Sequence, residues 1–328
     1  MVKSKRRKNA AEIQATAPNA AGVVTSAALA ARPASTSAAL AARPASTSVD
    51  ATAAEHGRIA PEASQVAVGD KLQAFAVAQL QRAIAYLAQP GNARHEGIHE
   101  GRKCIRRTRA TLALSTPTFK RNGCAARAAR LDHDLGQLCR GLSPLRDAQA
   151  LIEALARLGA VSPDVSAMVP SATKAAKARR DHLMQLALRR NPDFLSRRQR
   201  LGTAIKRTQQ LTWHDATGAE ITRAVARSLR RVEKAQRKAN RLPEHDEIWH
   251  VYRRRLRRLR QQDSLLTAIA PELRPAFEGL ELHAERLGES QDDALLLKHC
   301  GKRSPFTPTQ RKTLRTITSA RLRHMRSR

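Results

Sequence analysis

The stretch His99–Arg109, HEGRKCIRRTR, shares its spacing of basic residues with a second stretch, His250–Arg260, HVYRRRLRRLR. Each begins with a histidine and has arginines 3, 7, 8 and 10 residues later. At about 100° per residue, the histidine and the arginines at offsets 3, 7 and 10 fall within an arc of about 80° on one helical face. The repeated spacing therefore predicts two helices that each carry a row of cations.

These two rows, with the basic residue at offset 4, supply the candidate ligand-binding residues. The first row consists of His99, Arg102, Lys103, Arg106, Arg107 and Arg109. The second row consists of His250, Arg253, Arg254, Arg257, Arg258 and Arg260.

The opposite face of each predicted helix is suited to packing. It carries Cys104, Ile105, Thr108 and Leu112 in the first stretch, and Tyr252, Leu256 and Leu259 in the second. Like charges three and four residues apart oppose helix formation by a few tenths of a kcal/mol per pair, so a row of cations is typical of an anion-binding face. A planar guanidinium pairs with two phosphate oxygens at once, and a regular row of them suits an extended chain of phosphates. The alternative is a solvated face paired with acids elsewhere, and the duplicated spacing favours binding.

The charge balance of the whole chain also favours an anionic partner. The 328 residues include 60 Lys and Arg against 28 Asp and Glu, a formal net charge of +32, and such a chain repels itself unless anions relieve it. Aromatic residues make up only 3% of the chain. This shortage disfavours the binding of single-stranded nucleic acid, which usually stacks its bases on Phe, Tyr or Trp. A nucleic-acid-binding protein that uses the same basic surface remains the alternative, because charge alone does not separate the two.

Beyond residue 62 the apolar residues recur at helical spacing, and no long stretch alternates with period two. The sequence therefore predicts an all-α fold. Helices are expected at about 72–87, 94–115, 123–142, 144–159, 168–190, 193–212, 217–240, 245–269, 272–287, 291–300 and 309–326.

Residues 1–62 differ from the rest in composition. The sequence AALAARPASTS at 27–37 repeats at once at 38–48, and small residues with Pro bury too little surface to fold, so we expect a disordered arm with a basic tip. The remainder is expected to divide into a helical domain at 63–302, with halves at about 63–160 and 161–302, and a basic C-terminal helix or tail at 303–328.

A second element follows each row at a comparable distance. It reads LSPLRD at Leu142–Asp147 and LGESQD at Leu287–Asp292, which indicates two homologous halves. We expect Asp147 and Asp292 near a helix start, where a carboxylate caps amide groups or holds an arginine in position.

The two rows and the two later elements together resemble the CHAD domain, the conserved histidine α-helical domain, and the resemblance covers about residues 63–302. The two rows are similar to its histidine-headed basic motif, and Lys174–Arg190 resembles its middle helix. The two later elements resemble its Leu-Gly-x-x-Arg-Asp element, with Ser143 in place of Gly and Gln291 in place of Arg.

The resemblance implies two pseudo-symmetric helical bundles, mostly of four helices each, whose basic rows face a central groove or pore. It also implies binding of inorganic polyphosphate and association with polyphosphate granules and granule proteins. Many members are fused to a triphosphate tunnel metalloenzyme, whose Glu-x-Glu-x-Lys motif does not occur in this sequence.

Three kinds of enzyme motif bear on catalysis. His95–His99 reads HEGIH and matches the zinc-binding His-Glu-x-x-His pattern, but Gly97 weakens a helix and the cations that follow would repel a metal ion. No Walker phosphate loop occurs, and no catalytic triad can be assigned from spacing. We therefore expect a non-enzymatic protein with no catalytic residue, metal site or cofactor.

The sequence also bears on location. It has no run of about 18 apolar residues, so a membrane span is not expected. Cys104, Cys124, Cys139 and Cys300 form no Cys-x-x-Cys pair and are expected to be buried free thiols in a reducing compartment. These features favour a cytoplasmic protein, with a transit peptide at the basic N-terminus as the alternative. The resemblance to the CHAD domain implies that the protein is associated with polyphosphate granules.

Overall fold

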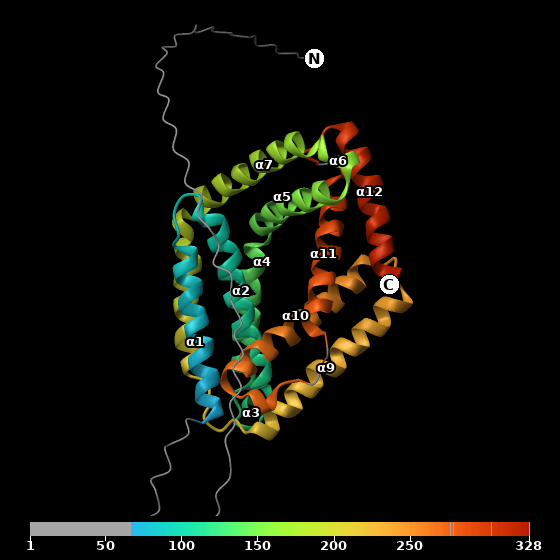
Figure 1. Ribbon diagram of the computed structural model, residues 1–328. Coiled ribbons are helices and arrows are strands. Elements are labelled where there is room, and N and C mark those ends of the chain that lie inside the picture. Colours follow the sequence, from blue (N-terminus) through green and yellow to red (C-terminus); the bar gives the residue numbers. More distant parts are fainter. Residues whose placement is uncertain (1–66, 276, 278, 303, 328) are drawn as a thin grey trace, which may run out of the picture. The chain divides into compact units, whose positions relative to one another are not determined.

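The computed structural model, drawn in Figure 1, describes residues 67–275, 277, 279–302 and 304–327. The regular elements of these residues are all helical, so the predicted all-α fold is confirmed. The expected arm, residues 1–62, lies outside the described residues. The long helices are α1 (Val68–Leu87), α2 (Ala93–Leu114), α4 (Ala125–Gly141), α5 (Ser143–Val161), α7 (Val169–Arg190), α8 (Leu195–Gln209), α9 (Gly218–Arg241), α10 (Asp246–Ile269), α11 (Leu280–His299) and α12 (Pro308–Ser327). The short elements are α3 (Thr116–Arg121), α6 (Pro163–Ser166) and the 3-10 turns η1 (Pro192–Phe194) and η2 (Pro271–Leu273).

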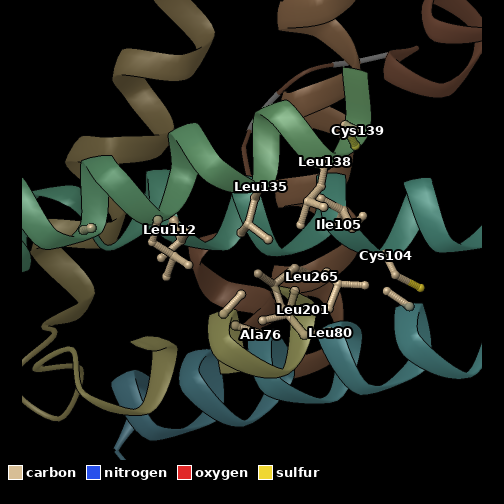
Figure 2. Close-up of a cluster of buried hydrophobic side chains, with 14 of the residues drawn as sticks. Ala76, Leu80, Cys104, Ile105, Leu112, Leu135, Leu138, Cys139, Leu201 and Leu265 are labelled. Carbon is tan, nitrogen blue, oxygen red and sulfur yellow. The ribbon is translucent and has the colours of Figure 1, made fainter. Parts of the chain in front are cut away.

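One bundle is formed by α1, α2, α4 and α8, in which α1 and α4 each contact both α2 and α8. Its core contains Leu80, Ile105, Leu135 and Leu201, one from each helix, and Leu265 of α10 joins them (Figure 2). Burying a leucine or isoleucine side chain contributes about 1.5–3 kcal/mol. The apolar face of α2 is therefore anchored in this core, which leaves its basic face free to point elsewhere.

The remaining long helices extend from this bundle, as Figure 1 shows. Helix α2 contacts α5 and α10, and α11 also contacts α5 and α10, so these four helices close a ring. Outside the ring, α7 packs on α5, α9 on α10 and α12 on α11. Two further apolar cores lie there, one around Leu155, Leu296 and Leu314 and one around Val232 and Leu256.

The C-terminal part of the domain differs from the sequence prediction. The helices expected at 272–287 and 291–300 are one helix, α11, which begins after Gly279 at a positive φ of 64°. Gly288 was expected to end a helix, but a glycine inside a helix costs only about 1 kcal/mol. The burial of Leu287 and Ser290 on either side of Gly288 offsets that cost. The prediction of a break at 288–290 is therefore wrong.

The division into two pseudo-symmetric halves stays a prediction. Helix α8 follows the expected boundary near residue 160, yet it packs with α1 and α4 of the first bundle. Packing therefore does not follow that boundary.

The predictions of buried cysteines and of no membrane-spanning helix can both be compared with the described residues. All four cysteines are buried free thiols, as predicted. Every helix in the described part of the chain is too polar or too short to cross a bilayer.

Candidate functional site

The first row on α2 and the second row on α10 meet at one cavity of about 490 Å³, which we call the basic cavity. Four of its lining residues are cations or histidine from α2 and three are arginines from α10: His99, Lys103, Arg106, Arg107, Arg253, Arg257 and Arg260. The rest of the lining is Leu256, Gln261, Asp263 and Ser264 of α10 and Glu281 and Ala284 of α11. The structure thus brings together residues that lie about 150 positions apart in the sequence.

The helices present their rows in this direction because their other faces are buried. Ile105 and Thr108 on α2 are fully buried, and so are Leu256 and Leu259 on α10. The predicted packing face is therefore confirmed for both helices.

Arg106 of α2 and Arg257 of α10 both line the cavity, and they are close enough for the charge of Arg106 to lower the pKa of Arg257. Burial, with the guanidiniums of Arg102 and Arg253, lowers the pKa of Arg106 to about 10. Burial, with the guanidiniums of Arg106 and Arg253, lowers the pKa of Arg257 to about 9. Neither arginine forms an ion pair with a described residue, and the Nε of Arg106 is buried without a hydrogen-bond partner. Both remain charged at pH 7, which leaves two desolvated cations without a counter-charge.

The two histidines that head the rows have different surroundings. Burial, with the guanidinium of Arg146, lowers the pKa of His99 to about 4, so His99 is neutral at pH 7. His250 is exposed, and its Nδ1 lies 2.9 Å from Oε1 of Gln291. Gln291, which stands in the LGESQD element where LSPLRD has Arg146, therefore holds His250 in place.

Two arginines of the first row are held by the protein instead of facing the cavity. Arg102 donates to the carbonyl of Cys139 and, at 2.7 Å, to Oγ of Ser143. Arg109 donates to both carboxylate oxygens of Asp132, at 2.8 and 2.9 Å. This hydrogen bonding raises the pKa of Arg109. The bidentate pair gives Arg109 a structural role between α2 and α4.

Two cavity residues form ion pairs that a ligand can replace. Lys103 Nζ lies 2.8 Å from Glu100, and Arg260 Nη1 lies 2.9 Å from Glu281, whose side chain is 78% exposed. The exposed Arg260–Glu281 pair contributes only about 0–1 kcal/mol, whereas the Lys103–Glu100 pair is half-buried. Arg260 is therefore the cation more readily available to a phosphate.

The other cations of the two rows are spread around the cavity and beyond it. Arg107 Nη1 lies 3.5 Å from Oε1 of Gln79, at the limit of a hydrogen bond. Burial lowers the pKa of Arg253, which lies against Gly288. Arg254 is exposed and Arg258 is half-buried, and neither lines the cavity.

Sequence reasoning missed Arg146 of α5 as a member of this cluster. Its charge lowers the pKa of His99, of Arg106 and of Arg253, so it lies close to both rows. It pairs with Glu153 at 2.9 Å, yet its Nη1 is buried without a partner. The signal in the sequence was the position of Arg146 directly before Asp147 in the element LSPLRD.

The two aspartates of the repeated elements occupy different positions. Asp147 is the fifth residue of α5, near its start as predicted, and burial raises its pKa against the nearby Arg102. Asp292 lies in the middle of α11, so its predicted place at a helix start is wrong. It pairs with Arg157 of α5 and therefore does hold an arginine, across the contact between α5 and α11.

The first histidine of the HEGIH segment, His95, contacts an aspartate of α7. His95 Nε2 lies 3.6 Å from Asp181, and burial lowers the pKa of His95. Within the described ranges, no cluster of three or more His, Cys, Asp or Glu is placed to hold a metal ion.

The fold and the site define an all-α protein with a cavity lined by cations from two helices. The family model of the CHAD domain matches residues 74–300, and the chain belongs to the CHAD domain family, which is known for polyphosphate binding. Among solved structures the chain is similar to PptA from Streptomyces chartreusis, at 18% identity and a TM-score of 0.47, over 79% of this chain and 95% of that one. No curated protein matches the chain.

Proposed function

We propose that this chain binds inorganic polyphosphate in the basic cavity without catalysing a reaction. The observation that carries the proposal is the meeting of Arg106 and Arg257, from two helices with the same spacing of basic residues, where neither forms an ion pair with a described residue. The family to which the chain belongs supports the choice of ligand.

The energetics of the cavity favour a polyanion. One pKa unit corresponds to about 1.4 kcal/mol, so the lowered pKa values of Arg106 and Arg257 represent several kcal/mol of unfavourable charge burial. A phosphate chain that donates no protons and accepts from both guanidiniums relieves this cost and forms charge-assisted hydrogen bonds. Binding is therefore driven by cations that the fold has already desolvated and placed.

The cavity chemistry favours binding over hydrolysis. Metal-assisted phosphoryl transfer needs carboxylates that are free to hold the metal ion. Only Asp263 and Glu281 supply carboxylates to the lining, and the Lys and Arg side chains beside them repel a divalent metal ion.

The size of the cavity favours a thin chain over a nucleic-acid duplex at this site. A volume of about 490 Å³ with half-buried guanidiniums admits a single phosphate chain. A duplex carries its phosphates on the outside of a wide, rigid helix and cannot insert them between α2 and α10. We therefore propose polyphosphate, and not duplex nucleic acid, as the ligand of the basic cavity.

The proposal includes attachment to polyphosphate granules in the cytoplasm. A polymer longer than the cavity extends outside it, so a chain bound at one segment stays attached to the bulk of the polymer. A fluorescent fusion should co-localise with granules, and a fusion with Arg106→Gln and Arg257→Gln should spread through the cell. Unchanged co-localisation of the variant would contradict the cavity as the attachment site.

Titration calorimetry with polyphosphate of defined chain length tests the binding proposal. We expect the Arg106→Gln, Arg257→Gln variant to bind at least tenfold more weakly than the original chain. The matched control is Lys174→Gln, Lys177→Gln, which removes the same charge from exposed positions on α7. Equal losses in the two variants would mean that net charge, and not the cavity, binds the polymer.

A further inference from the structure

Helix α9 carries a third row of cations, which we call the outer row: Arg223, Arg227, Arg230, Lys234, Arg237 and Arg241. At about 100° per residue these six fall within an arc of about 80° on one face of the helix. With a rise of about 1.5 Å per residue, the outer row is about 27 Å long. Its span and regularity exceed those of the rows in the cavity.

The outer row faces solvent because α9 packs by its other side. Ile221, Val225, Val232 and Ala239 are buried, and the helix contacts α10 along its length and α2, α3 and η2 near one end. A capping box between Thr217 and Glu220 fixes its first turn. In Figure 1, α9 lies at the edge of the helical unit, with α10 on its inner side.

The outer row carries a large excess of positive charge. None of its six side chains forms an ion pair or hydrogen bond with the described part of the chain. One acid, Glu233, lies on the flank of the row, three residues after Arg230 and four before Arg237, and offsets at most one of the six charges. Six like charges at spacings of three and four residues oppose helix formation, so the row favours an external anion.

We propose that the outer row binds the phosphate backbone of duplex nucleic acid without reading its sequence. A duplex carries about one negative charge per 1.7 Å of its axis, so a stretch as long as the row presents many phosphates. The row lies along one face of a single helix, and a stiff duplex meets it without the loss of conformational freedom that a flexible polyphosphate chain suffers on an open surface. Helix α9 has no aromatic residue, so it offers no platform on which the bases of a single strand could stack.

The outer row and the basic cavity are separate sites. The cavity is lined by residues of α2, α10 and α11, and no residue of α9 lines it. Because α10 lies between them, one chain can hold a duplex on α9 while the cavity is occupied. This inference therefore does not depend on the ligand of the cavity.

Fluorescence anisotropy with a labelled 24-base-pair duplex of mixed sequence and the full chain tests the proposal. The test variant is Arg227→Gln, Arg230→Gln, Lys234→Gln, Arg237→Gln, and the control is Lys174→Gln, Lys177→Gln, Arg189→Gln, Arg190→Gln on exposed positions of α7. Both remove the same charge. Circular dichroism checks that both retain helical content, which is expected because the changed residues are on the surface and carry like charges.

We expect the α9 variant to bind duplex at least tenfold more weakly than the control. Each lost phosphate contact reduces the slope of log K against log salt by about 0.9, so four should reduce it by about 3 to 4. Saturating the cavity with a short polyphosphate should leave duplex binding intact. Equal losses in the two variants would overturn the proposal, because net charge would then explain binding. It would also be overturned if the α9 variant lost polyphosphate binding and kept duplex binding.

Discussion

The basic cavity and the outer row of α9 use the same residue types at similar helical spacing in opposite environments. In the cavity, Arg106 and Arg257 are desolvated, and their pKa values fall to about 10 and about 9. On α9, Arg223, Arg230 and Arg237 are exposed to water. Burial raises the energy of the unpaired cations and restricts entry to a thin chain, whereas exposure leaves the charges screened and open to a wide partner. Our two proposals therefore assign the ligand of each surface by the burial of its arginines and not by their number.

The largest expected effect is the loss of polyphosphate from the cavity. Arg106→Gln with Arg257→Gln should weaken polyphosphate binding by tenfold or more and change duplex binding on α9 by less than twofold. Calorimetry with each ligand measures both. If both affinities fell together, the two surfaces would not be independent.

The ligand itself should stabilise the fold by a comparable amount. A ligand at 100 times its Kd stabilises the folded state by about 2.7 kcal/mol, which raises Tm by several degrees in a domain of this size. Thermal unfolding with and without polyphosphate measures this shift. The Arg106→Gln, Arg257→Gln variant should lose most of the shift, and an equal shift in that variant would place the stabilising site elsewhere.

Replacing Arg109 should separate structure from binding. Its bidentate pair with Asp132 joins α2 to α4, so Arg109→Gln should lower the free energy of unfolding by about 1–3 kcal/mol. Polyphosphate affinity should fall less than in Arg106→Gln, since Arg109 does not line the cavity. Chemical denaturation gives the free energy of unfolding, and calorimetry gives the affinity for polyphosphate. A larger loss of affinity than in Arg106→Gln would mean that Arg109 contacts the ligand.

The smallest expected effect is on pH dependence. The pKa of His99 is about 4 in the free chain, and a bound anion favours its protonated form and so raises that value. Binding then takes up a proton, and affinity should rise a few-fold as the pH falls from about 6.5 towards 4. Protonation of Asp147 and Asp292, whose pKa values burial raises, acts in the same direction. The difference between the original chain and His99→Gln isolates the histidine, and identical pH profiles would exclude it from the ligand contacts.

The sequence predicted those parts of the structure that depend on periodicity within one helix. Offsets of charged and apolar residues identified the two faces of α2 and α10, because a helix fixes which residues share a side. The same offsets could not show that Arg109 pairs with Asp132 or that Arg146 joins the cluster from α5, since these contacts depend on how helices pack. The break expected at Gly288 was wrong because tertiary packing outweighs the modest cost of one glycine in a helix. The outer row of α9 was readable from spacing, and its exposure required the structure.

A crystal structure of the chain with a short polyphosphate tests the central claim most directly. The account predicts one continuous phosphate chain in the basic cavity, within hydrogen-bond distance of guanidinium groups from both α2 and α10. An empty cavity with phosphates bound on outer helical faces would contradict it.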